Sequence, residues 1–153
     1  MGRIATIGVY GFTADDFVAA LLENGVCELL DVRQRRGVRG SEYAWANAQR
    51  LQRALAEAGV AYRHLPELAP TTHMRELQYA DDARSGVGKR DRTSLSAAFA
   101  ERYEREVLDE APLPALPERG IAALFCVETD PEACHRSLIA PRLADDVVHL
   151  RPR

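Results

Sequence analysis

The chain has 153 residues, a mass of 17.0 kDa and a formal net charge of −3 at pH 7, which is the size of one ordinary domain. Hydrophobic residues make up 46% and charged residues 28%, so a disordered chain and a fibrous repeat are excluded. The longest apolar run, Ile121 to Val127, is far too short for a membrane helix, and we therefore expect no membrane partner. An odd number of cysteines and an N-terminus without a secretory signal pattern predict a cytoplasmic protein.

Arginine dominates the basic residues. Lys89 is the only lysine among twenty basic side chains. A GC-rich genome is one explanation. The other is that some arginines serve the forked recognition of a carboxylate or phosphate, which lysine cannot imitate. The position of each arginine in the fold has to decide between the two.

Strand and helix patterns alternate from the first residues onward. Residues 3–8 predict a short buried strand closed by glycine, and the helix that follows has Thr13 as its N-cap and ends at Asn24 and Gly25. Residues 27–32 predict a second strand. Short links between strand, helix and strand predict parallel pairing with a right-handed crossover.

The rest of the chain continues this alternation. Gly59 ends a long helical pattern, and Thr71 or Thr72 caps the next one. The patterns predict helices over residues 41–58, 70–83, 94–109 and 131–145, the last one kinked by Pro141, and strands over 60–65, 121–127 and 147–150. This order predicts a single α/β domain over residues 1–153 with three layers: a mostly parallel central sheet of about five strands and helices on both faces.

The carboxyl edge of this sheet is the expected binding site, because ligands of open parallel sheets bind outside the carboxyl ends of the strands. Three segments reach that edge, namely residues 6–8, residues 31–40 and residues 126–136. The residues predicted to bind the ligand are Thr6, Gly8, Arg33, Arg35, Arg36 and Arg136.

The third of these segments carries the side chains best suited to chemistry. Cys126 and Glu128 share one face of a strand, since strand side chains alternate. A helix that begins at Pro131 would place Cys134 and His135 in its first two turns, where exposed amides favour a thiolate. We therefore predict Cys134, His135 and Glu128 as catalytic residues, with Cys134 as a nucleophile and the other two as proton carriers.

Several alternatives stay open for the same segment. Glu128 and Arg136 could form a purely structural ion pair, and Cys126 could be a core residue. A metal site made of Cys126, Glu128, Cys134 and His135 has no paired Cys-x-x-Cys or His-x-x-x-His spacing to support it. No metal is therefore predicted, and the cofactor stays unassigned.

Two basic clusters lie in predicted loops. The first, called here the basic loop (residues 33–40), has four arginines within seven residues, Arg33, Arg35, Arg36 and Arg39. It predicts either a solvated loop or a clamp for an anionic ligand, nucleic acid included. The second cluster, Lys89, Arg90 and Arg92, is interrupted by Asp91.

The motifs also resemble those of one known family. Thr6-Ile7-Gly8, Asp31-Val32-Arg33 and Cys126-x-Glu128 followed by Cys134-His135-Arg136 resemble the family called domain of unknown function 488. The order of residues 25–65 is similar as well. The family usually has a His-Ser pair where Val9 and Tyr10 stand here, and Pro and Ser soon after the Asp-Val-Arg. The resemblance implies a three-layer α/β fold with a pocket, and it implies no particular activity.

Two functions follow from these features. The first is binding of an anionic small molecule or nucleotide at the carboxyl edge, with a Cys/His/Arg/Glu site that could make the protein an enzyme. The alternative is a nucleic-acid- or protein-interaction module that uses the basic loop, with the Cys-Glu-Cys-His-Arg element structural. Binding of nucleic acid by the basic loop would weaken steeply with salt.

Overall fold

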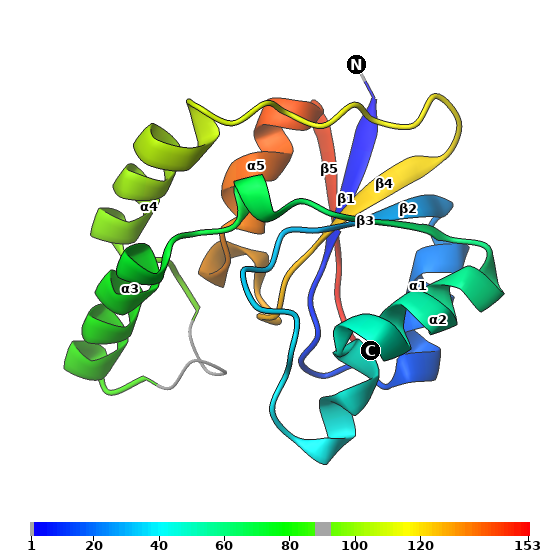
Figure 1. Cartoon of the computed structure of the whole chain (residues 1–153), viewed down its shortest axis with the longest axis horizontal. Helices are drawn as coiled ribbons and strands as arrows, with labels where there is room; N and C mark the ends of the chain where they lie inside the picture. Colours follow the sequence, from blue (N-terminus) through cyan, green and yellow to red (C-terminus); the bar gives the residue numbers. More distant parts are fainter. Residues whose placement is uncertain (1, 88–92) are drawn as a thin grey trace.

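The central sheet has five strands, and all of them are parallel. The computed structural model describes residues 2–87 and 93–153, so the second predicted basic cluster lies outside the described residues. The strands are β1 (Arg3–Ile7), β2 (Val26–Asp31), β3 (Ala61–His64), β4 (Ile121–Phe125) and β5 (Asp146–Leu150). They pair in the order β3-β2-β4-β1-β5, which confirms the predicted parallel sheet (Figure 1).

Helices cover both faces of this sheet. One side carries α1 (Ala14–Glu23) and α2 (Ala48–Ala58), and the other carries α3 (Thr72–Ser85), α4 (Ala97–Tyr103) and α5 (Arg136–Leu143) (Figure 1). The predicted three-layer α/β architecture is confirmed. None of the described helices combines the length and the apolar character needed to cross a membrane.

Local capping signals explain where most helices begin and end. The Thr13 hydroxyl accepts a hydrogen bond from the amide of Asp16, and the Thr71 hydroxyl accepts one from Met74. Gly59 ends α2 in the left-handed region, at a φ of 77°, which glycine adopts without strain. These interactions lie within a few residues in sequence, so the sequence patterns found them.

The predicted helix over residues 41–58 is wrong, because it is divided at Asn47. Residues Ser41–Ala46 form a 3₁₀ helix, Asn47 is extended with φ −66° and ψ 143°, and α2 follows. The Asn47 side chain accepts a hydrogen bond from the amide of Val38 at 2.7 Å. Asn47 therefore ties the basic loop to the start of α2 instead of continuing a helix.

The last predicted helix begins later than the sequence indicated. Pro131–Ala133 form one 3₁₀ turn, Cys134 is extended with φ −135° and ψ 147°, and α5 begins only at Arg136. The prediction that Cys134 and His135 lie inside the first helical turns is therefore wrong. A smaller difference concerns α4, which Ser96 caps and which continues as a π-helix over Glu104–Leu108.

Candidate functional site

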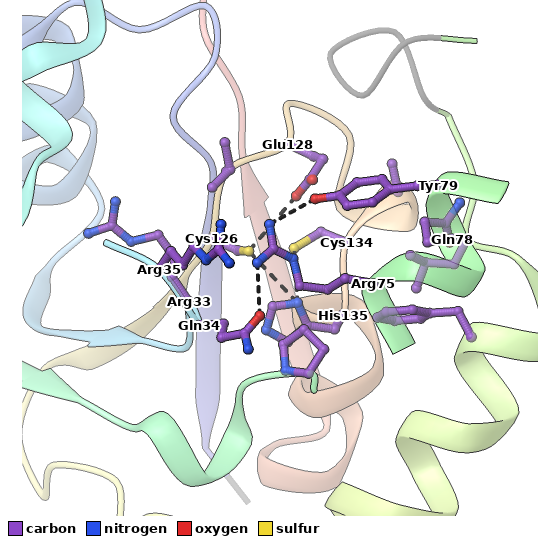
Figure 2. A pocket seen from close by; sticks show the side chains of 15 residues that line it. Arg33, Gln34, Arg35, Arg75, Gln78, Tyr79, Cys126, Glu128, Cys134 and His135 are labelled. Carbon is purple, nitrogen blue, oxygen red and sulfur yellow. Dashed lines mark hydrogen bonds between the residues drawn. The ribbon is translucent and has the colours of Figure 1, made fainter. Parts of the chain in front are cut away.

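A pocket of about 520 Å³, including its open mouth, lies at the carboxyl edge of the sheet (Figure 2). Its walls come from residues 33–35 after β2, 126–128 after β4 and 133–135 before α5. Side chains of α3 and α4 close the remaining side. The carboxyl edge therefore holds a pocket where the rule for parallel sheets places one.

Two cysteines and a histidine form the floor of this pocket. Cys126, Cys134 and His135 are buried, and their sulfur and ring-nitrogen atoms all lie within 4.8 Å of one another. His135 Nδ1 is 3.8 Å from Cys126 Sγ and 3.7 Å from Cys134 Sγ. We call these three residues the sulfur–imidazole cluster.

A main-chain carbonyl sets the orientation of the histidine ring. His135 Nε2 lies 2.8 Å from the carbonyl oxygen of Val32, which can only accept a hydrogen bond. Nε2 therefore carries a proton, and in the neutral ring the lone pair of Nδ1 faces both sulfurs. The ring of Tyr103 packs edge-on against the imidazole at 5.3 Å and restricts it further.

The two thiols differ in acidity because they are close neighbours. The adjacent sulfur of Cys134 and burial both raise the pKa of Cys126 above its ordinary value. Burial alone would raise the pKa of Cys134, but the thiol of Cys126 and the positive charges of His135 and Arg136 lower it well below its ordinary value. Burial lowers the pKa of His135, and the sulfur of Cys134 outweighs that and raises it. Cys134 is thus the sulfur that loses its proton first.

Glu128 lies beside the cluster and lines the pocket. Its side chain is buried, and Oε2 accepts a hydrogen bond from the thiol of Cys126 at 3.8 Å. The structure therefore brings the three predicted catalytic residues, Cys134, His135 and Glu128, together in one pocket.

Arg136 and Gly8 lie behind the pocket rather than in its wall. Arg136 is 0% exposed and donates hydrogen bonds to the carbonyl oxygens of Glu128 and Thr129. A Cβ on Gly8 would lie 2.0 Å from the same Glu128 oxygen. Within the described residues, Arg136 thus holds the turn after β4 through carbonyl groups instead of an ion pair. The predicted ligand contacts of both residues stay predictions, and their placement supports a structural role.

Arg33 lines the pocket but is occupied by internal partners. Its guanidinium is 2% exposed, forms two hydrogen bonds with Asp31 at 2.8 and 2.9 Å, and donates a third to the carbonyl of Ala46. It also lies 4.6 Å from the ring centre of Phe125. The ion pair is local to the end of β2, and the hydrogen bond to Ala46 joins that end to the segment before α2.

Of the other residues predicted to bind the ligand, Arg35 lines the pocket, whereas Arg36 and Thr6 do not. Arg35 is exposed and lines the pocket, although its guanidinium extends away from the cluster (Figure 2). Arg36 donates a hydrogen bond to Tyr62, which in turn donates to Asp31. Thr6 is buried and bonded to His149 on the neighbouring strand, outside the pocket lining.

Arg75 is the charged residue of the described pocket lining that the sequence analysis missed. It reaches from α3 across the pocket and donates hydrogen bonds to Gln34 Oε1 and to the Tyr79 hydroxyl, both at 2.8 Å (Figure 2). Among the described residues, no carboxylate pairs with it. The available signal was the spacing of Arg75, Gln78 and Tyr79, which places three polar side chains on one face of a helix.

Comparison with known proteins places the chain in a family. No curated protein and no solved structure matches it. The model of the family described as "Domain of unknown function DUF488" matches residues 13–143, a range that contains β2, β4 and the whole floor of the pocket. The chain therefore belongs to the DUF488 family.

Proposed function

We propose that this protein binds an anionic small molecule, a phosphate- or carboxylate-bearing metabolite or nucleotide, in the pocket at the carboxyl edge of its sheet. Arg75 would hold the anionic group at the mouth, and Arg35 would reach it once its side chain turns toward the pocket. Cys134, His135 and Glu128 on the floor would act on the bound molecule.

The single observation that carries this proposal is the state of Arg75. Its two hydrogen bonds go to a neutral amide oxygen and a neutral hydroxyl, so its positive charge is not neutralised by them. A guanidinium has five N–H donors, and a planar fork of them matches a carboxylate or phosphate. Within residues 2–87 and 93–153, no carboxylate lies within hydrogen-bond distance of Arg75, and an anion in the pocket would supply that counter-charge.

The floor supplies the electron-rich groups. The sulfur of Cys134 is the one that loses its proton first, and Nδ1 of His135 lies 3.7 Å from it. Glu128 is the carboxylate in the pocket lining and is placed to accept a proton from a bound molecule or from Cys126.

The alternative, a nucleic-acid- or protein-interaction module built on the basic loop, has less support. Arg33 is buried in its pair with Asp31, and Arg36 is bonded to Tyr62. Arg35 and Arg39 are exposed, so half of the four arginines of the basic loop face outward.

Anion binding is tested by calorimetry at low salt with three probes: inorganic phosphate, AMP and succinate. We expect at least one of them to bind, and adenosine, which has no charge, to bind more weakly than AMP. Arg75→Gln should weaken binding about tenfold or more, because a hydrogen bond to a charged group contributes about 1.5–3 kcal/mol.

Arg84→Gln is the matched control for this measurement. Arg84 lies on the same helix, pairs with Asp81, and its side chain is 72% exposed. It should leave the affinity unchanged. If none of the three anions binds, or if both substitutions weaken binding equally, the proposal is wrong.

A further inference from the structure

We propose that the sulfur–imidazole cluster is a zinc site: Cys126 Sγ, Cys134 Sγ and His135 Nδ1 would hold one Zn²⁺, with a fourth coordination position open to the pocket. The inference goes beyond anion binding, which depends on Arg75. It rests on the proposed function only for the nature of the molecule that would occupy the fourth position.

The distances between the three donor atoms are close to those expected around one tetrahedral zinc ion. At the tetrahedral angle, a zinc–sulfur bond of about 2.3 Å and a zinc–nitrogen bond of about 2.0 Å place sulfur and nitrogen about 3.5 Å apart and two sulfurs about 3.8 Å apart. The observed nitrogen–sulfur distances are 3.7 and 3.8 Å, and all three donors lie within 4.8 Å of one another. Side-chain shifts of a few tenths of an ångström, and less than about 1 Å for the sulfurs, would complete the geometry.

The histidine is already oriented as a metal ligand. Histidines that bind metals donate their other ring N–H to a carbonyl or carboxylate, which fixes the ring and leaves the ligating nitrogen unprotonated. Nε2 of His135 makes this bond to the Val32 carbonyl at 2.8 Å. The remaining nitrogen, Nδ1, points at both sulfurs and not at solvent.

The charge and the burial of the sulfur–imidazole cluster also favour a zinc ion. Each residue of the cluster is at most 6% exposed, and a buried thiolate without compensation is costly. When one Zn²⁺ binds the cluster, the protons held by the two sulfurs and by Nδ1 of His135 are released, and the two thiolates balance the charge of the ion. Soft and borderline donors of this kind select zinc over magnesium or calcium.

The open fourth position gives the site a chemical use. Three protein ligands with one position left for water or substrate are typical of catalytic zinc, and two cysteines with one histidine are among the known sets. All three residues line the pocket, and Glu128 lies beside Cys126. Glu128 would accept a proton from zinc-bound water, while the electron pair of Cys134 binds the metal instead of attacking a substrate.

The experiment uses the full chain without a histidine tag, stripped of metal by a chelator and titrated with Co²⁺. We expect one Co²⁺ per chain, with the intense visible bands of a tetrahedral ion and a sulfur-to-cobalt charge-transfer band, both removed when Zn²⁺ displaces the cobalt. Cys126→Ser, Cys134→Ser and His135→Asn should each weaken Zn²⁺ binding by more than the ~100-fold that losing an outer partner costs.

Cys27→Ser is the matched control, since Cys27 donates to the carbonyl of Arg119 elsewhere in the molecule. It should leave the cobalt spectrum unchanged. Weak bands of an octahedral ion, no stoichiometric uptake, or a spectrum that survives Cys134→Ser would overturn the assignment.

A second measurement needs no substitution and covers the case in which a variant fails to fold. Adding Zn²⁺ to the metal-stripped wild-type chain should slow alkylation of Cys126 and Cys134 relative to the same chain without metal, and it should leave the rate at Cys27 unchanged, as read by peptide mass spectrometry. Equal protection of all three cysteines, or of none, contradicts the site. Anion binding measured on the metal-stripped chain with the Arg75→Gln variant fails or succeeds independently of this result.

Discussion

The backbone at Gly8 passes so close to the turn after β4 that a side chain has no room. A Cβ there would lie 2.0 Å from the carbonyl oxygen of Glu128 and 3.3 Å from Nη1 of Arg136. That carbonyl is also an acceptor for Arg136. One glycine therefore permits the contact that places Glu128 beside the pocket.

Gly8→Ala should destabilise the protein by about 1–3 kcal/mol, the usual cost of overpacking a buried position. Gly37→Ala serves as the control, because its Cβ would meet no atom closer than 4.0 Å and its φ is not in the left-handed region. It should lie within about 0.5 kcal/mol of the wild type. Urea unfolding of both variants measures the difference, and an equal effect of the two would contradict the close-contact argument.

Arginine side chains serve three different purposes in this molecule. Arg33 and Arg136 are buried and hold chain segments together through the main-chain carbonyls of Ala46 and Glu128, respectively. Arg75 lies in the pocket with neutral partners. Several others form exposed ion pairs, such as Arg153 with Glu23, which contribute little to stability. Local density of charge in the sequence therefore did not identify the arginine best placed for an anion.

At the scale of elements, the interruption before α2 determines how the basic loop is held. The Asn47 side chain accepts from the amide of Val38, and the same residue makes no capping bond to α2. The helical pattern of residues 41–58 did not predict this break. Nothing in that pattern indicates that the Asn47 side chain bonds to the Val38 amide outside it.

Asn47→Ala should speed hydrogen exchange of the Val38 amide by about five- to tenfold, since an ordinary hydrogen bond contributes about 1 kcal/mol. Asn47→Asp keeps the acceptor oxygen and should retain the protection of Val38. Exchange followed by NMR checks both variants, with the amides of α2 as internal reference. Unchanged exchange at Val38 in the alanine variant would show that this bond does not hold the loop.

At the scale of the whole molecule, the pocket lies between the tightly packed central strands and the more loosely attached helices α3 and α4. The strands β2, β4 and β1 form the buried centre of the sheet, whereas α3 packs mainly on α4. Gln78 strengthens that pair of helices by accepting from the amide of Ser96. The wall that carries Arg75 is therefore attached to the sheet less firmly than the floor that carries the cysteines.

Native-state hydrogen exchange should reflect this difference. Amides of α3 and α4 should open with a lower free energy than those of β1 and β4, because fewer buried contacts tie them to the core. Mass spectrometry of exchanged peptides in increasing urea measures both. A single opening free energy shared by the helices and the central strands would contradict the weaker attachment of α3 and α4.

The sequence by itself determined the order of strands and helices, their parallel arrangement and most of their ends. These depend on hydrophobic periodicity and on caps such as Thr13 and Thr71, which act within a few residues. Parallel strands also bring their carboxyl ends to one edge, so Cys134, His135 and Glu128 were predicted to share a site.

Only the tertiary structure decided what those side chains touch. Cys134 is extended and precedes α5. The Nδ1 of His135 that faces its sulfur is oriented by the Val32 carbonyl, more than a hundred residues from His135 in sequence. Arg75 lines the pocket because α3, packed on α4, forms one side of it, a placement that no local pattern specifies. The partner of a buried polar side chain often comes from a distant part of the sequence. That partner determines whether a charged side chain is neutralised inside the fold or is left to bind a ligand.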